Sequence, residues 1–396
     1  MPGPLTQVRV IELAGIGPSP FACMMLADAG AEVIRVEPPG GRAGPASKYD
    51  VLNRSRHANI VLDLKKPLGK QVLLRLVATA DALVEGYRPG VLEKLGIGPA
   101  VLAEANPKLV VGRMTGWGQK GPYATAAGHD INYIALSGVL HSLGPAGAKP
   151  SPPVNLVGDF GGGGMLLAFG VTAAVLAARA PGGKGQVVDA AMVDGSAALA
   201  ASLYGLRSQG FWSDERGTNL LDGGAHFYDT YECSDGRFVS VGSIEKKFYT
   251  LLLSLAGLQG VPALAPRAQM GRHSNWPAQK ALVAAAFRTK TRDEWCGIME
   301  HSDVCFAPVL TMGEAPQHPH AKARGAFVEV SGVVQPAPCP RFEVSGSAPV
   351  EAPRRVGADT AAVLRELGVS SSDTQAVLQM GNTKASEPLI RLESKL

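Results

Sequence analysis

Short apolar runs alternate with helix-like segments through the first 120 residues, and this alternation constrains the fold more than any other feature of the sequence. Crossover helices between strands join those strands in parallel. A strand and a helix follow again in residues 183–195. We therefore expect an α/β fold with a parallel sheet. The predicted strands cover residues 8–13, 31–37, 59–64, 81–87 and 109–118, and helices with apolar residues at helical spacing cover about 21–29 and 65–80.

The pattern changes near Gly224. Residues 225–243 indicate two strands around Ser-Asp-Gly, which is typical of a hairpin, and residues 245–305 are largely helical in pattern. We expect a second, smaller α+β domain there. The predicted division is a large domain over 1–197, a linker over 198–223, the small domain over 224–325, and a linker with a C-terminal segment over 326–396.

Composition excludes several classes of protein. The 396 residues are 46% apolar and 18% charged, as in compact globular proteins, and their number suits two domains. The net charge of +4 comes without any run of Lys or Arg, so we expect no nucleic-acid partner. The five cysteines are scattered, without a CxxC pair or zinc-ligand spacing, which indicates a reducing compartment and no disulfide framework.

Two segments concern the location of the protein in the cell. Residues 161–178 carry no charge and approach membrane-spanning length, but four glycines open them, and we predict a buried core helix and no membrane span. The chain starts without the basic and apolar regions of a signal peptide. It ends in Ser394, Lys395 and Leu396, a tripeptide that the peroxisomal import receptor reads, so a peroxisome or related microbody is expected.

Nucleotide-binding motifs are incomplete. Gly15 and Gly17 stand between a predicted strand and helix, and Glu37 follows at the distance of a ribose-binding acid. Pro20, however, takes the third glycine's place, and Pro18 lacks an N–H for phosphate. A tight turn is therefore preferred to an NAD site. The chain also lacks a P-loop, a GxSxG elbow and an HExxH motif.

Two acid–base residues stand in parallel settings. His129 lies in GHDINYIALSGVL, directly before an apolar helix, and Asp159 lies in PVNLVGDFGGGG, directly before the glycine-opened helix. Each alone fits a helix cap better than a catalytic residue. Together, two such residues at glycine-flanked helix starts indicate an active site, because free N–H groups there stabilise an anionic oxygen.

Six segments carry a resemblance to the family III CoA-transferase superfamily, and within it to the α-methylacyl-CoA racemases. The resemblance runs from about residue 5 to 325 and is strongest at GHDINY and GDFGGGG. It implies an interlocked homodimer, with a Rossmann-like large domain that the C-terminal segment completes. It also places the active site between the large domain of one chain and the small domain of the other. The six segments are residues 9–37, 84–99, 128–140, 153–164, 183–195 and 221–249.

The resemblance also implies roles for individual residues. His129 and Asp159 would be the two bases, and Glu245 would lie near the histidine. In place of the arginine that often follows the acid of the second strand, this chain has Pro38, so a phosphate contact there would need Arg35 or Arg42. The implied CoA-binding residues are Leu62, Asp63, Leu64, Lys65, Arg88, Gly128, Asp130, Ile131, Asn132 and Tyr133.

The expected reaction is racemisation of 2-methylacyl-CoA thioesters through an enolate. One base removes the α-proton and the other delivers a proton on the opposite face, while the N–H of Asp130 is the expected enolate donor. No metal or organic cofactor is needed. The acyl group, a branched fatty acid or a bile-acid side chain, stays open.

Two alternatives remain. In a CoA-transferase, Asp159 would be a nucleophile; such enzymes need no histidine opposite it and typically carry a GGGGQ-type loop, which is missing after residue 224. A non-catalytic acyl-CoA-binding protein would need neither His129 nor Asp159.

Overall fold

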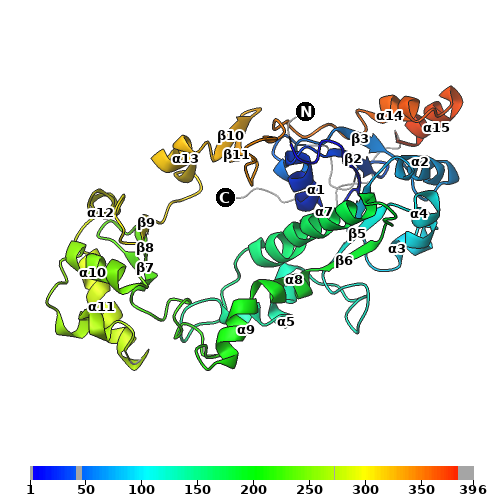
Figure 1. The fold of residues 1–396 in the computed structure, drawn as a ribbon. Coiled ribbons are helices and arrows are strands. Elements are labelled where there is room, and N and C mark those ends of the chain that lie inside the picture. Colours follow the sequence, from blue (N-terminus) through cyan, green and yellow to red (C-terminus); the bar gives the residue numbers. More distant parts are fainter. Residues whose placement is uncertain (1–2, 42–46, 272, 382–396) are drawn as a thin grey trace. The chain divides into compact units, whose positions relative to one another are not determined.

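The computed structural model describes residues 3–41, 47–271 and 273–381. Within them, a parallel sheet of six strands has the order β3-β2-β1-β4-β5-β6, which confirms the predicted α/β fold (Figure 1). The order reverses between β1 and β4, as in doubly wound sheets that bind ligands at that point. The strands are β1 (Arg9–Leu13), β2 (Glu32–Glu37), β3 (Ala58–Val61), β4 (Ala82–Glu85), β5 (Val110–Thr115) and β6 (Val187–Ala191).

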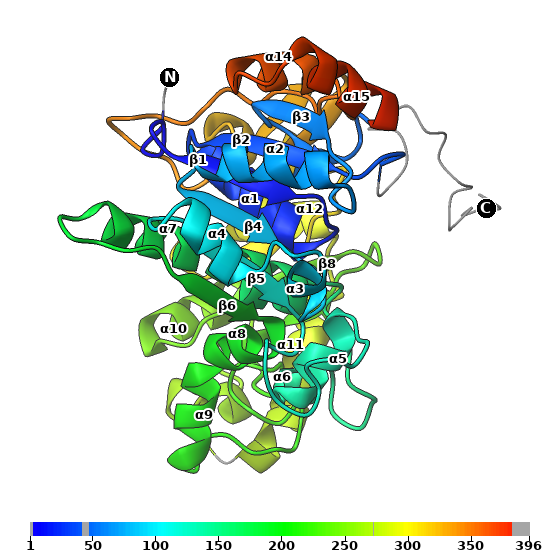
Figure 2. The ribbon, with the colours of Figure 1, turned by 90° about the vertical axis from the view of Figure 1, so that its right-hand side faces the viewer.

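Helices cover both faces of this sheet because successive strand residues point to opposite sides. On β1, Ile11 and Leu13 belong to one apolar cluster and Val10 to another. The first cluster is closed by α2 (Pro67–Val77) and α4 (Pro99–Ala105), which Figure 2 shows over the sheet. The second is closed by α1 (Pro18–Asp28) and α7 (Leu166–Arg179).

The end of the chain covers the edge of the sheet. The N–H of Asn59 in β3 donates to Asp359 Oδ2 at 2.9 Å, and the N–H of Val61 donates to Thr360 Oγ1 at 3.1 Å. Helix α14 (Thr360–Glu366) begins there, and α15 (Ser371–Gly381) follows it. These contacts pair the N–H groups of an edge strand that would otherwise lack partners.

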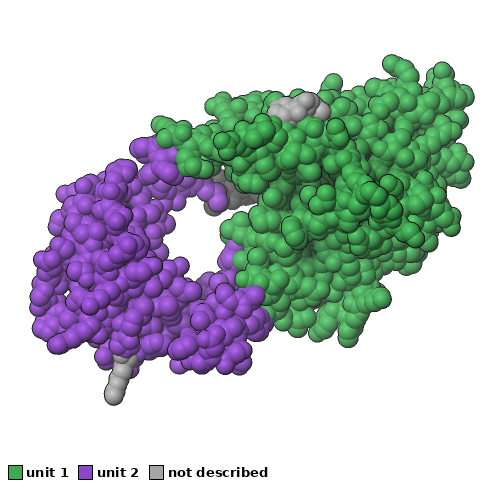
Figure 3. Space-filling view, in the orientation of Figure 1, with its two compact units in different colours: residues 1–137, 154–199, 322–396 green, residues 138–153, 200–321 purple. Residues whose placement is uncertain are grey.

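Contacts divide the chain into two units, coloured in Figure 3. Residues 1–137, 154–199 and 322–396 form unit 1, and residues 138–153 and 200–321 form unit 2. In unit 2 the predicted hairpin is confirmed, with β7 (Tyr228–Glu232) antiparallel to β8 (Phe238–Gly242). A helix missed by the sequence analysis, α9 (Ala201–Ser208), lies in the predicted linker. The predicted domain boundaries themselves stay predictions.

The remaining elements are short or belong to unit 2. Strand β9 joins the hairpin in a three-stranded sheet, and β10 pairs with β11. Cysteines in all five positions are free. The bounds are α3 (Val91–Lys94), α5 (Asp130–Leu136), α6 (Val139–Ser142), α8 (Met192–Leu199), α10 (Lys246–Leu255), α11 (Trp276–Phe287), α12 (Arg292–Met299), α13 (Pro319–Ala323), β9 (Phe306–Pro308), β10 (Phe327–Val330) and β11 (Val333–Pro336).

The glycine-opened helix is buried on one side only. Within the described residues, Leu156–Arg179 is the one helix whose length and composition would suit a membrane span, a test that core helices also pass. One face of α7 packs on the sheet, whereas Phe169 and Leu176 are 71% and 76% exposed. The predicted buried core helix is thus correct for one face and wrong for the other.

Candidate active site

Asp159 lies in a π-helix, Leu156–Met165, that runs directly into α7. The helix starts after Asn155, so Asp159 sits in its first turn, and the idea that Asp159 is an N-cap is wrong. Glycines allow this wide, tightly packed turn: a Cβ atom on Gly162 would lie 2.6 Å from the backbone nitrogen of Ser196 in α8. A side chain there would force the two helices apart.

The carboxylate of Asp159 faces the turn between β1 and α1. A Cβ atom on Gly17 would lie 3.2 Å from Asp159 Oδ2. Gly15 and Gly17 therefore belong to a tight strand-to-helix turn beside an acid, where the carboxyl end of β1 meets the reversal of strand order. Ligands of doubly wound sheets bind at this position.

His129 is the N-cap residue of α5, as its sequence setting predicts. The imidazole is exposed, and its backbone N–H donates to Asn132 Oδ1 at 3.0 Å. The hydroxyl of the buried Tyr133 donates to the carbonyl of Gly128, which fixes the segment that enters the helix. The histidine is thus held by its backbone while its ring stays accessible.

Asp130 joins the two helix starts. It is the first residue of α5 and only 7% exposed, and its Oδ2 accepts the backbone N–H of Asp159 at 2.7 Å. This bond brings the element that carries His129 against the element that carries Asp159, all within unit 1. The sequence analysis missed it, although both acids stand in the two most distinctive motifs.

Burial of its carboxyl group raises the pKa of Asp159 above the usual value. The amide of Asn155, 3.2 Å from Oδ2, opposes this shift, the negative charge of Asp130 adds to it, and His129 opposes it. An aspartate with a raised pKa can hold a proton nearer neutral pH and can therefore act as an acid as well as a base. Among the described residues, no group of three or more His, Cys, Asp or Glu is placed to hold a metal ion.

The predicted CoA-binding residues fall in two regions of unit 1. Gly128, Asp130, Ile131, Asn132 and Tyr133 surround the start of α5, where Ile131 and Asn132 are exposed. Burial raises the pKa of Tyr133, and the positive charge of Arg88, which follows β4, opposes this shift.

The second region follows β3. Leu62 is 1% exposed and part of the apolar core, so it offers almost no surface to a ligand, and its predicted role in CoA binding stays a prediction. Asp63 Oδ1 accepts the N–H of Lys65 at 3.0 Å, Lys65 is exposed, and Leu64 packs partly against the core. This loop lies at the same carboxyl edge of the sheet as Asp159, two strands beyond β1.

Arg35 cannot simply replace a phosphate-binding arginine at Pro38. It is 2% exposed and donates to Glu12 Oε1 and, at 2.7 Å, to Glu37 Oε1. A phosphate contact would require breaking these bonds. Arg42, the other predicted candidate, lies outside the described residues.

Glu245 is the N-cap residue of α10 and is exposed. It belongs to unit 2, whereas His129 belongs to unit 1. Its predicted role therefore stays a prediction.

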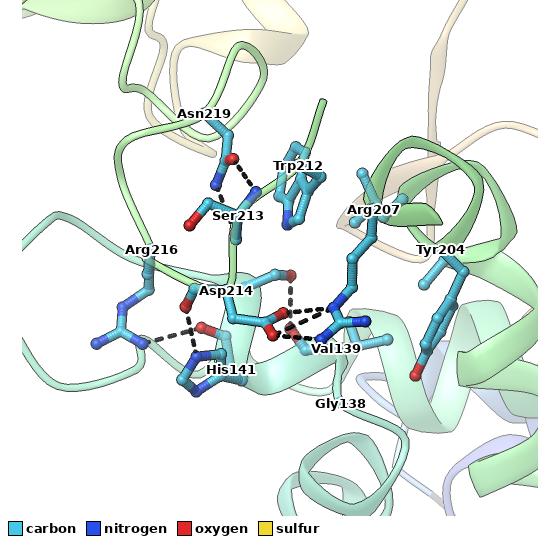
Figure 4. Close-up of a pocket in the computed structure, with 13 residues that line it drawn as sticks. Gly138, Val139, His141, Tyr204, Arg207, Trp212, Ser213, Asp214, Arg216 and Asn219 are labelled. Atoms are coloured by element: carbon cyan, nitrogen blue, oxygen red, sulfur yellow. Dashed lines mark hydrogen bonds and ion pairs between the residues drawn. The ribbon is translucent and has the colours of Figure 1, made fainter. Parts of the chain in front are cut away.

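A separate cavity of about 250 Å³ lies within unit 2 (Figure 4). The Arg207–Asp214 ion pair, 2.7 Å long, crosses its wall, and His141 Nε2 lies 2.8 Å from the carbonyl oxygen of Asp214. None of the predicted site residues lines this cavity.

Comparison with known proteins identifies the family. The profile of CoA-transferase family III matches residues 5–360. The chain is 44% identical over 97% of its length to the mouse (Mus musculus) α-methylacyl-CoA racemase, covering 97% of that protein, and 42% identical over 96% of its length to the human (Homo sapiens) one, covering 99%. A crystal structure of a CaiB/BaiF family protein from Brucella suis superposes with a TM-score of 0.80 at 27% identity, over 93% of this chain and 100% of that one. The chain therefore belongs to CoA-transferase family III.

Proposed function

We propose that this protein is an isomerase that inverts the α-carbon of 2-methylacyl-CoA thioesters, with His129 and Asp159 as its two bases. The names of the mouse and human relatives support the reaction. The observation that carries the proposal is the pairing of an aspartate of raised pKa with an accessible histidine, at two helix starts joined through Asp130. Two groups that both work as acid and base near neutral pH are what inversion of a C–H centre needs.

The two bases take opposite roles in the two directions. In one, His129 removes the α-proton and the protonated Asp159 delivers one; in the other, Asp159 is the base and the imidazolium is the acid. The intermediate enolate oxygen requires donors already in place, and the N–H of Asp130 in the first turn of α5 is our candidate. Glu245 of the other chain of a homodimer would orient His129. Since two side chains make the proton transfers and a backbone N–H stabilises the enolate, the proposal requires no metal or organic cofactor.

CoA would bind along the carboxyl edge of the sheet. The exposed Lys65 and Arg88 are available to phosphate groups, and the partly exposed Asp63 and Leu64 are available to the adenosine part. Such contacts far from the reacting carbon contribute binding energy that positions it between the bases.

The alternative is a CoA-transferase that uses Asp159 as a nucleophile. Relatives of this chain carry the names of both reactions. The mouse and human proteins are called racemases, whereas another relative is called a CoA-transferase. The structure favours proton transfer, because Asp159 has a raised pKa and Asp130, the residue after His129, binds its backbone N–H. A transferase needs a carboxylate but no second base.

The test is an assay of a single 2-methylacyl-CoA epimer in buffer with a chelator, with and without added carboxylic acid. We expect conversion to a mixture of epimers without the acid. Conversion only to a new thioester of the added acid would establish the transferase instead. Binding of the thioester without any conversion would indicate a non-catalytic binding protein.

We further propose a homodimer, because α7 exposes an apolar face. Met165, Phe169 and Leu176 recur at helical spacing along one side of the continuous helix and are 47%, 71% and 76% exposed, and such a row of large apolar side chains is typical of an interaction surface. Sedimentation should give the mass of a dimer. Combining Phe169→Asp with Leu176→Asp should raise the dissociation constant of the dimer by about 100-fold, about tenfold for each residue. Val344→Asp, at a residue 99% exposed, is the control and should leave the dimer intact; an equal effect would contradict this face as the interface.

A peroxisomal location is proposed from the final tripeptide. Ser394, Lys395 and Leu396 lie outside the described residues. A fluorescent fusion that remained peroxisomal after their deletion would contradict this proposal.

A further inference from the structure

We infer that the Asp130 carboxylate is a positioning residue that holds the two bases in register, an inference that rests on the proposed function. No role for this side chain follows from the reaction itself, since neither proton passes through it. Its backbone N–H, the candidate enolate donor, is retained in every variant at this position. Substitutions therefore isolate what the carboxylate does.

The geometry is that of a clamp between two elements. Asp130 follows the N-cap His129 directly, so its backbone moves with the histidine. Its Oδ2 accepts the N–H of Asp159 at 2.7 Å, so the second base is tied to it as well. A hydrogen bond to an ionised oxygen is short and strong, and this one is buried. The other oxygen, Oδ1, is buried with no hydrogen-bond partner among the described residues.

Gly158 is shaped to admit this carboxylate. A Cβ atom built on Gly158 would overlap Asp130 Oδ2, with Ile134 also in contact at 3.2 Å. Gly158 does not have a positive φ, so alanine would fit its backbone, and its methyl group would displace Asp130 far more than Ile134. The absence of a side chain at Gly158, directly before Asp159, therefore leaves the space that the Asp130 carboxylate, directly after His129, occupies.

The same carboxylate also acts on Asp159 by its charge. The groups that face Asp159 are Asn155 on its own helix and His129, Asp130 and Tyr133 at the start of α5. The turn before α1 presents Gly17, which carries no charge. Asp194 on α8 is exposed. Of the acidic groups, Asp130 is the one that raises the pKa of Asp159.

The experiment compares Asp130→Asn and Asp130→Ala with wild type on each epimer of a 2-methylacyl-CoA, as a function of pH. Alanine removes both clamp and charge, and we expect kcat to fall about 100-fold with KM largely unchanged. Asparagine keeps an oxygen for the Asp159 N–H, so kcat should stay within about tenfold of wild type. Without the charge, the pKa of Asp159 falls, so the acidic limb should move to lower pH for the epimer that uses Asp159 as base.

The control is Asp194→Asn, which removes an exposed carboxylate from the adjoining helix and should change neither kcat nor the pH profile. Gly158→Ala should reproduce the kcat of Asp130→Ala, and the double variant should be no worse than either. Thermal unfolding of each variant shows that it is folded.

Two outcomes overturn the inference: Asp130→Ala with wild-type kcat, or Asp130→Asn with an unmoved acidic limb. A lowered stability with unchanged kcat and pH profile would assign Asp130 a merely structural role. If wild type converts neither epimer, the proposed function fails instead, so the two failures are distinguishable.

Discussion

Asp159→Asn is expected to lower kcat for epimer conversion by about 1,000-fold while KM changes little. The amide has nearly the shape of the carboxyl group but neither takes nor delivers a proton. The backbone N–H bond to Asp130 is unaffected, so the site keeps its geometry. The measurement is the steady-state rate for each epimer, followed by the configuration of the product.

The variant should also show which base removes the α-proton of which epimer. With His129 intact, the epimer whose proton faces the imidazole should still exchange it with solvent, returning with unchanged configuration. His129→Ala should show the reverse, with exchange confined to the other epimer. Loss of exchange from both epimers in both variants would contradict independent roles for the two bases.

Glu12→Ala is expected to lower the free energy of unfolding by about 3–5 kcal/mol. Glu12 is fully buried in β1 and accepts bonds from Arg35 and, at 2.6 Å, from Arg56. Both arginines are at most 2% exposed. The variant leaves Arg56 with only backbone carbonyls as partners among the described residues, and Arg35 with Glu37 as its remaining carboxylate. Urea-induced unfolding followed by circular dichroism measures the change.

A matched control separates this effect from the loss of any glutamate. Glu104 is exposed on α4, and Glu104→Ala should change the free energy of unfolding by no more than about 0.5 kcal/mol. Glu12→Gln keeps an acceptor and should cost less than alanine. A loss below about 1 kcal/mol for Glu12→Ala would mean that water or other groups replace the carboxylate.

The regular part of the fold could be predicted because its signals are local. Apolar runs and helical spacing place β1 to β5, α1 and α2 to within a few residues, since burial of one face requires that periodicity. The helix start at His129 was predictable for the same reason. Its N-cap position depends on the residues that follow it.

The rest depends on contacts between distant segments. The register of β1 and β2 sets Arg35 opposite Glu12 and so decides that Arg35 is not available to a phosphate. A slip of one residue would turn its side chain to the other face of the sheet. The π-helix around Asp159 forms because glycines let α1 and α8 approach. The bond from Asp159 to Asp130 joins residues 29 positions apart. None of these three features can be predicted from residues that are neighbours in the sequence.

The most direct test of the two-base account is deuterium incorporation from D₂O into a pure 2-methylacyl-CoA epimer by the wild-type protein. No second carboxylic acid is present. Because the proton removed and the proton delivered belong to different side chains, the account predicts that product of inverted configuration carries solvent deuterium at the α-carbon. Inverted product without deuterium, or transfer of CoA to an added acid with no exchange at the α-carbon, would contradict it.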